Sequence, residues 1–176
     1  MLSSGPDVVV LENLSDSIKK IGRLGVALQA VRELVRWKAM PQLRVTAAGS
    51  TFSAGWAIIG TARSYAGPYH ATPGADPFAA NFEVVVQRSV GRLCAIPFAL
   101  GIPLGRHVRR HDVWRATVDA VELAPAEGWS GLHYQLDGDL AGELPVSASI
   151  DPELLLMRLP GPVVEPVFTA APAPAG

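Results

Sequence analysis

Hydrophobic residues near the start of the chain recur at steps of three and four, the spacing of an amphipathic helix. Ser15 stands where a helix N-cap would be, and Pro41 stands where the helix must end. The apolar positions are Ile18, Ile21, Leu24, Leu28, Val31, Leu34 and Val35. We therefore predict one long N-terminal amphipathic helix. Its other face carries six Lys and Arg residues against Asp16 and Glu33, which is typical of a solvated face, with contact to an anionic membrane as the alternative.

After Pro41 the pattern changes to short apolar runs separated by glycine and proline, as in strands joined by turns. In residues 132–136 and 144–150 the apolar residues occupy every second position, which predicts strands with one buried face. The predicted strands are 43–48, 56–61, 82–87, 113–123, 132–136, 144–150 and 154–159. Such a series is typical of an antiparallel β-sandwich or barrel.

Two further segments complete the predicted fold. Residues 90–101 indicate a short apolar helix interrupted by Pro97, and residues 161–176, rich in proline and alanine, indicate a loosely held tail. We expect a mainly β (α+β) protein: an antiparallel β-sandwich-like domain over residues 1–160, with one long N-terminal amphipathic helix and one short apolar helix.

Composition and charge narrow the classes of protein. With 176 residues, 49% of them hydrophobic, the chain has enough apolar surface for one core. Fifteen basic and sixteen acidic residues give a net charge of -1, which argues against nucleic acid as a partner.

A single cysteine, Cys94, allows no internal disulfide and no paired-cysteine metal site, and its apolar surroundings indicate a packing residue of the core. The first residues lack the pattern of a signal peptide, and residues 45–62 and 93–105 are interrupted too often to cross a bilayer. We expect a cytoplasmic protein, and contact with the inner face of the membrane stays open.

Most of the common sequence motifs of nucleotide-binding and metal-binding sites are absent. The chain has no Gly-Lys step and no Gly-x-Gly-x-x-Gly, so we expect no nucleotide to bind to it alone. His107 and His111 have the spacing of metal ligands on a helix, but the arginines between and beside them would repel a cation, and no metal site is expected. We interpret residues 106–111 as an exposed polar loop, with a phosphate or lipid head group as the alternative ligand.

The most informative short run is Asp137-Gly138-Asp139, at the end of an alternating strand. Asp137 and Gly138 both tolerate positive φ, so the plain interpretation is a β-hairpin turn whose charges face water. The functional alternative is that the turn projects Asp139 from the rim of the sheet, where a carboxylate can accept a proton from a substrate hydroxyl.

Four stretches follow one another along the chain: residues 5–10, residues 20–25, residues 65–76, and residues 136–139 with the strands after them. In this order they resemble the C-terminal β domain of the bacterial diacylglycerol kinase and sphingosine kinase family of lipid kinases. Residues 5–10, Gly-Pro-Asp-Val-Val-Val, look like the opening strand of that domain, with its Gly-Phe-Asp-Ala motif, and residues 20–25 look like its lysine-glycine helix. Residues 65–76 are similar to the loop before its Asp-Gly-x-Leu-Asp-Val strand. Residues 136–139, with the strands that follow, are similar to its Asp-Gly-Glu motif.

This resemblance implies a role for the hairpin. Kinases of the family have a nucleotide lobe with Gly-Gly-Asp-Gly-Thr, and only the β lobe is present here. Asp139 would take the general base position, Asp137 would belong to a supporting polar and metal network, and Gly138 would make the turn. The substrate would be a lipid with a free hydroxyl, such as diacylglycerol or a sphingoid base. Mg-ATP would come with the missing lobe, so no cofactor is expected on this chain alone.

The sequence departs from the family pattern at two positions. Asp139 stands where the family has Glu, one methylene longer. Ala79 stands where the family has an Asp that holds a structural magnesium, so no metal is expected there unless Asp76 substitutes for it.

A second class of function stays open, namely a non-catalytic β module that binds a lipid or a protein. The basic helix face and the arginines of residues 106–110 favour this class. Strand edges left open by a missing lobe would also favour a homodimer.

Overall fold

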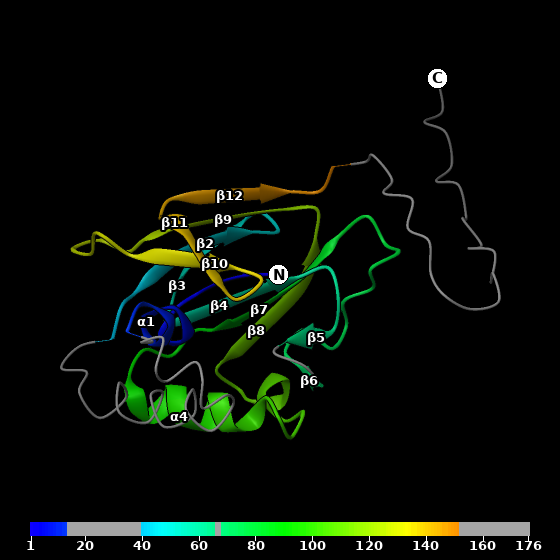
Figure 1. Cartoon of the computed structure of the whole chain (residues 1–176), viewed down its shortest axis with the longest axis horizontal. Helices are drawn as coiled ribbons and strands as arrows, with labels where there is room; N and C mark the ends of the chain where they lie inside the picture. Colours follow the sequence, from blue (N-terminus) through cyan, green and yellow to red (C-terminus); the bar gives the residue numbers. More distant parts are fainter. Residues whose placement is uncertain (14–39, 66–67, 152–176) are drawn as a thin grey trace.

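The structure is a computed structural model that describes residues 1–13, 40–65 and 68–151 (Figure 1). The predicted helix after Ser15, the predicted strand at 154–159 and the predicted tail at 161–176 lie outside the described residues.

Short strands dominate the described part of the chain, with a few helices between them. In chain order the elements are β1 (Leu2–Ser4), α1 (Pro6–Glu12), β2 (Leu43–Ala47), β3 (Ser50–Ala54), β4 (Trp56–Gly60), β5 (Ser64–Tyr65), β6 (Tyr69–His70), β7 (Phe82–Gln87), α4 (Arg92–Gly101), the 3-10 helix η1 (His107–Arg109), β8 (Val113–Val118), β9 (Ala120–Pro125), β10 (His133–Leu136), β11 (Asp139–Glu143) and β12 (Val146–Ser149).

Two antiparallel sheets make up the sandwich. The larger has the order β11-β10-β1-β4-β7-β8, the smaller has the order β12-β9-β2-β3, and β5 pairs with β6 in a separate hairpin. Figure 1 shows the smaller sheet on one side of the larger one and α4 on the other. The predicted mainly β, sandwich-like fold is confirmed.

The main core lies between the two sheets. Its residues come from alternate positions of facing strands, as two sheets packed face to face require. Burying a large aliphatic side chain stabilises a fold by about 1.5–3 kcal/mol. The buried members are Leu2, Leu43, Val45, Ala47, Ala54, Ala57, Ile59, Val84, Val86, Val118, Val121, Leu123 and Leu144.

A second core covers the outer face of the larger sheet. Phe98 and Ile102, from α4 and its C-terminal end, pack there on Trp56, Ile58 and Val85. β4 is therefore buried on both faces, and so is most of β7. This explains why the sequences of the two strands are mostly consecutive apolar residues and do not alternate between apolar and polar residues.

The short apolar helix is confirmed as α4, with Pro97 inside it. Gly101 lets the next segment approach closely, because a Cβ there would lie 2.9 Å from the backbone nitrogen of His107. The prediction that Cys94 fills the core is wrong, because this side chain is only partly buried. No helix in the described part of the chain has both the length and the apolar character needed to cross a bilayer.

The predicted opening strand at residues 5–10 is wrong, because these residues begin helix α1 and the strand lies just before them, at Leu2–Ser4. Pro6 occupies the first helical turn, where its fixed φ suits a helix, and Asp7 follows in the same turn. Gly5 has φ 143°, and a Cβ there would lie 2.8 Å from Cδ1 of Trp56. The close turn at Gly5 separates the strand from the helix.

The single predicted strand at 113–123 is in fact two strands. β8 belongs to the larger sheet and β9 to the smaller one, with Asp119 between them. The core-facing positions shift by one at Asp119, from Trp114, Ala116 and Val118 in β8 to Val121 and Leu123 in β9. Strands β3 and β11 were not predicted either.

The predicted exposed loop at 106–111 is wrong for His107, which is fully buried. Its Nε2 donates a hydrogen bond to the carbonyl oxygen of Ala71 over 2.8 Å, and its ring meets that of Phe98 edge-on at 5.6 Å. Arg106, Arg109 and His111 are exposed. His107 and His111 do not share a face that could hold a metal.

The Arg110–Asp112 ion pair ties the segment after η1 to β8. The guanidinium donates two hydrogen bonds of 2.9 Å to the buried Asp112 carboxylate. Burial favours the neutral acid, but the hydrogen bonds and charge of Arg110 outweigh it and lower the pKa of Asp112.

We expect the Asp112→Asn variant to be less stable than the parent at neutral pH, with a difference that shrinks as the pH falls below about 4. A carboxyl whose pKa is lowered on folding stabilises the native state above its unfolded pKa, and that stability is lost as it protonates. Urea unfolding of both proteins at several pH values measures this. A difference that stays constant down to acid pH would contradict the assignment.

Candidate functional site

The Asp137-Gly138 turn joins β10 to β11, as predicted. Asp137 has φ 50° and Gly138 has φ 97°, so both central residues have the positive φ of a type I′ turn. The turn places Asp139 opposite Leu136, as the first residue of β11. The hairpin tip, residues 136–140, thus lies at one end of an edge strand of the larger sheet.

We expect Gly138→Ala to destabilise the protein by about 1–2 kcal/mol, because an L-residue is strained at this φ. Crowding does not contribute, since no atom lies within 4 Å of the position of the added Cβ. Gly49→Ala, in the β2–β3 turn, is a matched control with open space and φ 71°. Urea unfolding of both variants measures the cost, and a neutral Gly138→Ala would contradict it.

A buried chain of hydrogen bonds holds the hairpin tip in place. Gln135 Nε2 donates to Ser3 Oγ over 2.6 Å, and Ser3 Oγ donates to the carboxylate of Asp7. Gln135 Oε1 accepts a hydrogen bond of 2.6 Å from the backbone nitrogen of Gly138. The turn is therefore tied through β1 to the first turn of α1.

Sequence reasoning missed this network. The alternation in residues 132–136 predicts that Tyr134 and Leu136 lie on the buried face and that Gln135 faces water. In the structure Gln135 is buried and Leu136 is partly exposed. The outer face of the larger sheet is covered as well, so a polar residue can be buried on it once it has partners. The signal available in the sequence was the serine pair at positions 3 and 4. Ser3 lies opposite Gln135 in the neighbouring strand β10, and Ser4 Oγ donates a hydrogen bond to the carbonyl oxygen of His133.

The Asp137 carboxylate points away from the buried network. It is largely exposed and lies 2.6 Å from the backbone nitrogen of Met1, while the Asp137 backbone nitrogen donates to the Met1 carbonyl oxygen over 2.9 Å. Membership of a metal network stays a prediction for this residue.

The Asp139 side chain is exposed at the rim of the larger sheet. Leu136 and Leu140 beside it are about half-exposed. The tip thus combines accessible carboxylates with uncovered apolar side chains, and Asp139 can be reached from solvent. The general-base role of Asp139 stays a prediction.

The loop before β7 is held by an acidic side chain of that strand. Buried Glu83 accepts a 2.5 Å hydrogen bond from the backbone nitrogen of Gly74 and pairs with Arg115 at 2.5 Å. A Cβ at Gly74 would lie 2.7 Å from the Arg115 guanidinium. Glycine at this position lets the loop lie directly on the ion pair.

The residues of this loop do not fit a structural magnesium. Ala79 offers no side-chain oxygen, and one oxygen of Asp76 accepts a hydrogen bond of 3.0 Å from the backbone nitrogen of Phe78. Within the described ranges, no group of three or more His, Cys, Asp or Glu side chains is arranged to hold a metal. We derive no chemistry from a metal here.

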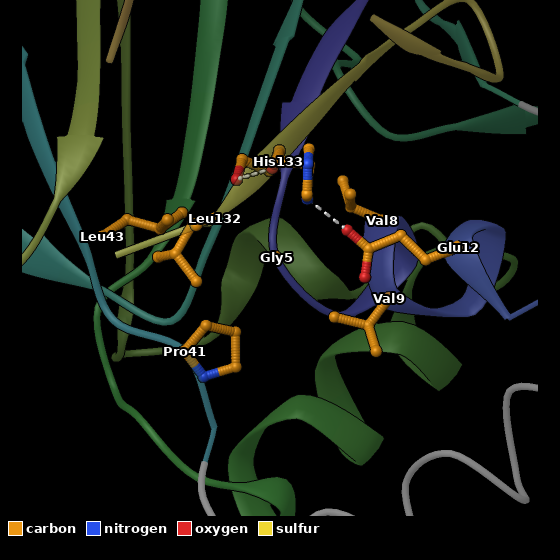
Figure 2. A pocket seen from close by; sticks show the side chains of 10 residues that line it. Gly5, Val8, Val9, Glu12, Pro41, Leu43, Leu132 and His133 are labelled. Carbon is orange, nitrogen blue, oxygen red and sulfur yellow. Dashed lines mark hydrogen bonds and ion pairs between the residues drawn. The ribbon is translucent and has the colours of Figure 1, made fainter. Parts of the chain in front are cut away.

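A small hollow lies between α1 and β10 (Figure 2). Its volume is about 50 Å³, room for very few water molecules. At its rim His133 Nδ1 lies 2.6 Å from the Glu12 carboxylate, and Nε2 lies 3.6 Å from Glu143. This hollow is far too small for a lipid chain.

A wider, open hollow of about 570 Å³ lies over the smaller sheet and the β8–β9 turn. Its lining consists mainly of Thr, Ser, Ala and Gly side chains, together with Asp119 and Glu122. Such a surface is too open to serve as an acyl-chain slot.

The fold defines a class of protein: a domain of two antiparallel sheets, the larger of which carries helices on its outer face. The chain belongs to the family of the YegS C-terminal NAD kinase beta sandwich-like domain, whose model matches residues 1–158. The predicted resemblance to the C-terminal β domain of diacylglycerol kinase-like proteins is thereby confirmed.

Solved structures with this fold come from Bacillus anthracis str. Sterne. One, a diacylglycerol kinase, has a TM-score of 0.54 and 14% identity, with 86% of this chain and 51% of that chain covered. Another, assigned as a diacylglycerol kinase, has a TM-score of 0.57 and 12% identity over 83% of this chain and 48% of that chain. The present chain thus spans about half of each. No curated protein matches the chain in sequence at a significant level.

Proposed function

We propose that this chain is the C-terminal, lipid-binding domain of a diacylglycerol kinase-like lipid kinase, and that Asp139 is its general base. The observation that carries the proposal is the exposed carboxylate of Asp139, next to a turn tied to buried Gln135 and Ser3. Membership of the family and a length of about half that of the diacylglycerol kinases of the same fold support it.

In this proposal Asp139 accepts the proton of a lipid hydroxyl as the hydroxyl oxygen attacks the γ-phosphorus of ATP. A bond forms between that oxygen and the phosphorus, the bond to the bridging oxygen breaks, and ADP leaves. Bound Mg-ATP would supply the phosphoryl group and neutralise its charge, from a nucleotide lobe that this chain does not contain. The residues of this chain orient the lipid and hold the proton. The exposed Leu136 and Leu140 give the hydroxyl-bearing end of the lipid an apolar surface beside the base.

The test starts with the chain alone, incubated with labelled ATP, magnesium and diacylglycerol. We expect no labelled phosphatidic acid, because a base without a phosphate-binding lobe cannot position the phosphoryl group. Turnover well above a blank without protein would contradict the idea of a missing lobe. The reading frame upstream of Met1 is expected to encode a Gly-Gly-Asp-Gly-Thr stretch, and its absence would count against the proposal.

A non-catalytic lipid- or protein-binding module is the second candidate. It is favoured by Ala79, which removes a family carboxylate, and by the shorter Asp139. If this candidate is right, the Asp139→Asn variant should bind vesicles or a partner as well as the parent does. A full-length protein with the nucleotide lobe should then show no kinase activity. The kinase proposal also places the protein at the cytoplasmic side, where ATP and lipid meet.

A further inference from the structure

Helix α4 is apolar on both faces, but only one face has a partner among the described residues. The inner face, with Ala95, Phe98 and Gly101, is buried against the larger sheet. The outer face carries large aliphatic side chains in solvent: Leu93 is 84% exposed, Leu100 is 65% exposed, and Leu104, just beyond the helix, is 66% exposed. We call Leu93, Ile96, Leu100 and Leu104 the outer α4 face.

A helix that is apolar all round normally lies in an apolar environment on every side. Leu93, Ile96 and Leu100 follow one another at steps of three and four, so they form one stripe rather than scattered exposed residues. Contiguous exposed apolar side chains of this kind mark an interaction surface.

The segment that carries the outer α4 face is basic in sequence. Residues 89–111 contain four arginines and no Asp or Glu, and one of these arginines, Arg110, is paired with Asp112. Arg106 and Arg109 are exposed immediately after Leu104. Arginine carries a permanent charge and binds phosphate with several donors, so the face combines apolar side chains with phosphate-binding ones.

We propose that the outer α4 face, with Arg106 and Arg109, docks this domain on an anionic lipid bilayer. A bilayer interface offers both parts of this chemistry, namely phosphate groups and acyl chains. A second copy of the chain fits less well, because a twofold contact would bring arginines against arginines. Residues 14–39 fit less well for the same reason, with six basic and two acidic residues.

The inference is independent of the kinase proposal, because it requires neither Asp139 nor ATP. It locates a membrane contact on an element other than the basic helix face suggested by the sequence. The proposed insertion of α4 into the bilayer is shallow, because α4 has ten residues and its aliphatic side chains would enter only the interfacial region.

The test is flotation of the full chain with phosphatidylcholine vesicles, with and without phosphatidylglycerol. We expect binding only to the vesicles with phosphatidylglycerol, weakened by high salt. Leu93→Ser with Leu100→Ser should lower the affinity roughly 10- to 100-fold, and Arg106→Glu with Arg109→Glu about tenfold or more. Matched controls are Phe78→Ser, an apolar-to-polar change at a residue that is 74% exposed elsewhere on the surface, and Arg44→Glu on β2. Both should leave binding unchanged.

A second measurement tests whether the outer α4 face is accessible to solvent when no membrane is present. With Cys94 replaced by Ser, Leu93→Cys should react with a maleimide as fast as Phe78→Cys, and anionic vesicles should slow only the reaction at position 93. Slow labelling without vesicles would overturn the proposal, since another part of the chain or a second copy would already cover α4. Equal binding to both kinds of vesicle, no binding to either, or unchanged binding of the Leu and Arg variants would overturn it too.

Discussion

Replacing Asp139 by Asn in the full protein, with its nucleotide lobe, is expected to lower kcat by about 10²–10⁴-fold, the usual contribution of a general base. The amide keeps the size and polarity of the side chain but cannot take the proton of the lipid hydroxyl. The variant should fold normally, because Asp139 is exposed at the end of β11. Initial rates of lipid phosphorylation at saturating lipid and ATP measure the effect.

Two further variants make this test specific. Asp139→Glu restores the side chain of the family motif and should retain activity within about tenfold, because the base is kept and only its reach changes. Asp119→Asn, at the turn between β8 and β9, changes an acidic residue away from the hairpin tip and should leave kcat unchanged. Full activity of Asp139→Asn would exclude this residue as the base, whatever the lipid.

Replacing Phe98 by Ala is expected to lower the free energy of unfolding by about 3–5 kcal/mol, a large share of the stability of a domain of this size. Phe98 is fully buried between α4 and the larger sheet, with its ring centroid 5.2 Å from that of Trp56 and 5.6 Å from that of His107. The alanine would leave a cavity lined by these rings. Urea unfolding followed by circular dichroism measures the loss.

The matched control lies two residues further along the same helix. Leu100→Ala removes an exposed side chain of the outer α4 face and should change the stability by about 0.5 kcal/mol or less. Similar losses for Leu100→Ala and Phe98→Ala would show that both faces of α4 are packed, and would also contradict the free surface that we infer. A small loss of stability for Phe98→Ala would mean that α4 contributes little to the core.

The sequence predicts the fold best where one physical signal dominates. Runs of consecutive apolar residues identified β4 and the middle of β7, and the apolar residues with Pro97 identified α4, because burial on both faces favours apolar side chains at successive positions. The prediction failed at residues 113–123, where the core-facing positions shift by one at Asp119 because the chain changes sheets there. At residues 5–10 the expected strand came from the resemblance to a Gly-Phe-Asp-Ala stretch, whereas Pro6 and the tight turn at Gly5 favour a helix start.

The candidate site was predicted only in part. The turn at Asp137-Gly138 follows from local backbone preferences, which sequence shows directly. The buried support of that turn depends on Ser3 and Gln135, which are 132 residues apart and meet only because β1 lies beside β10. No local pattern contains that pairing. The buried His107 is a similar case, because its partner Ala71 is supplied by a distant loop.

Strand β1 is the first described strand to be synthesised, yet it lies in the interior of the larger sheet, between β4 and β10. Its residues pair with Ile58 and Ile59 on one side and with Gln135 and Leu136 on the other. On the ribosome, one side of β1 therefore has unsatisfied backbone groups until residue 136 has emerged. A pairing of such long sequence separation forms slowly, and an open strand edge invites intermolecular association in the meantime. Yield during expression should therefore depend on protecting this edge in the nascent chain, by slow synthesis or by chaperones, more than on the stability of the finished domain.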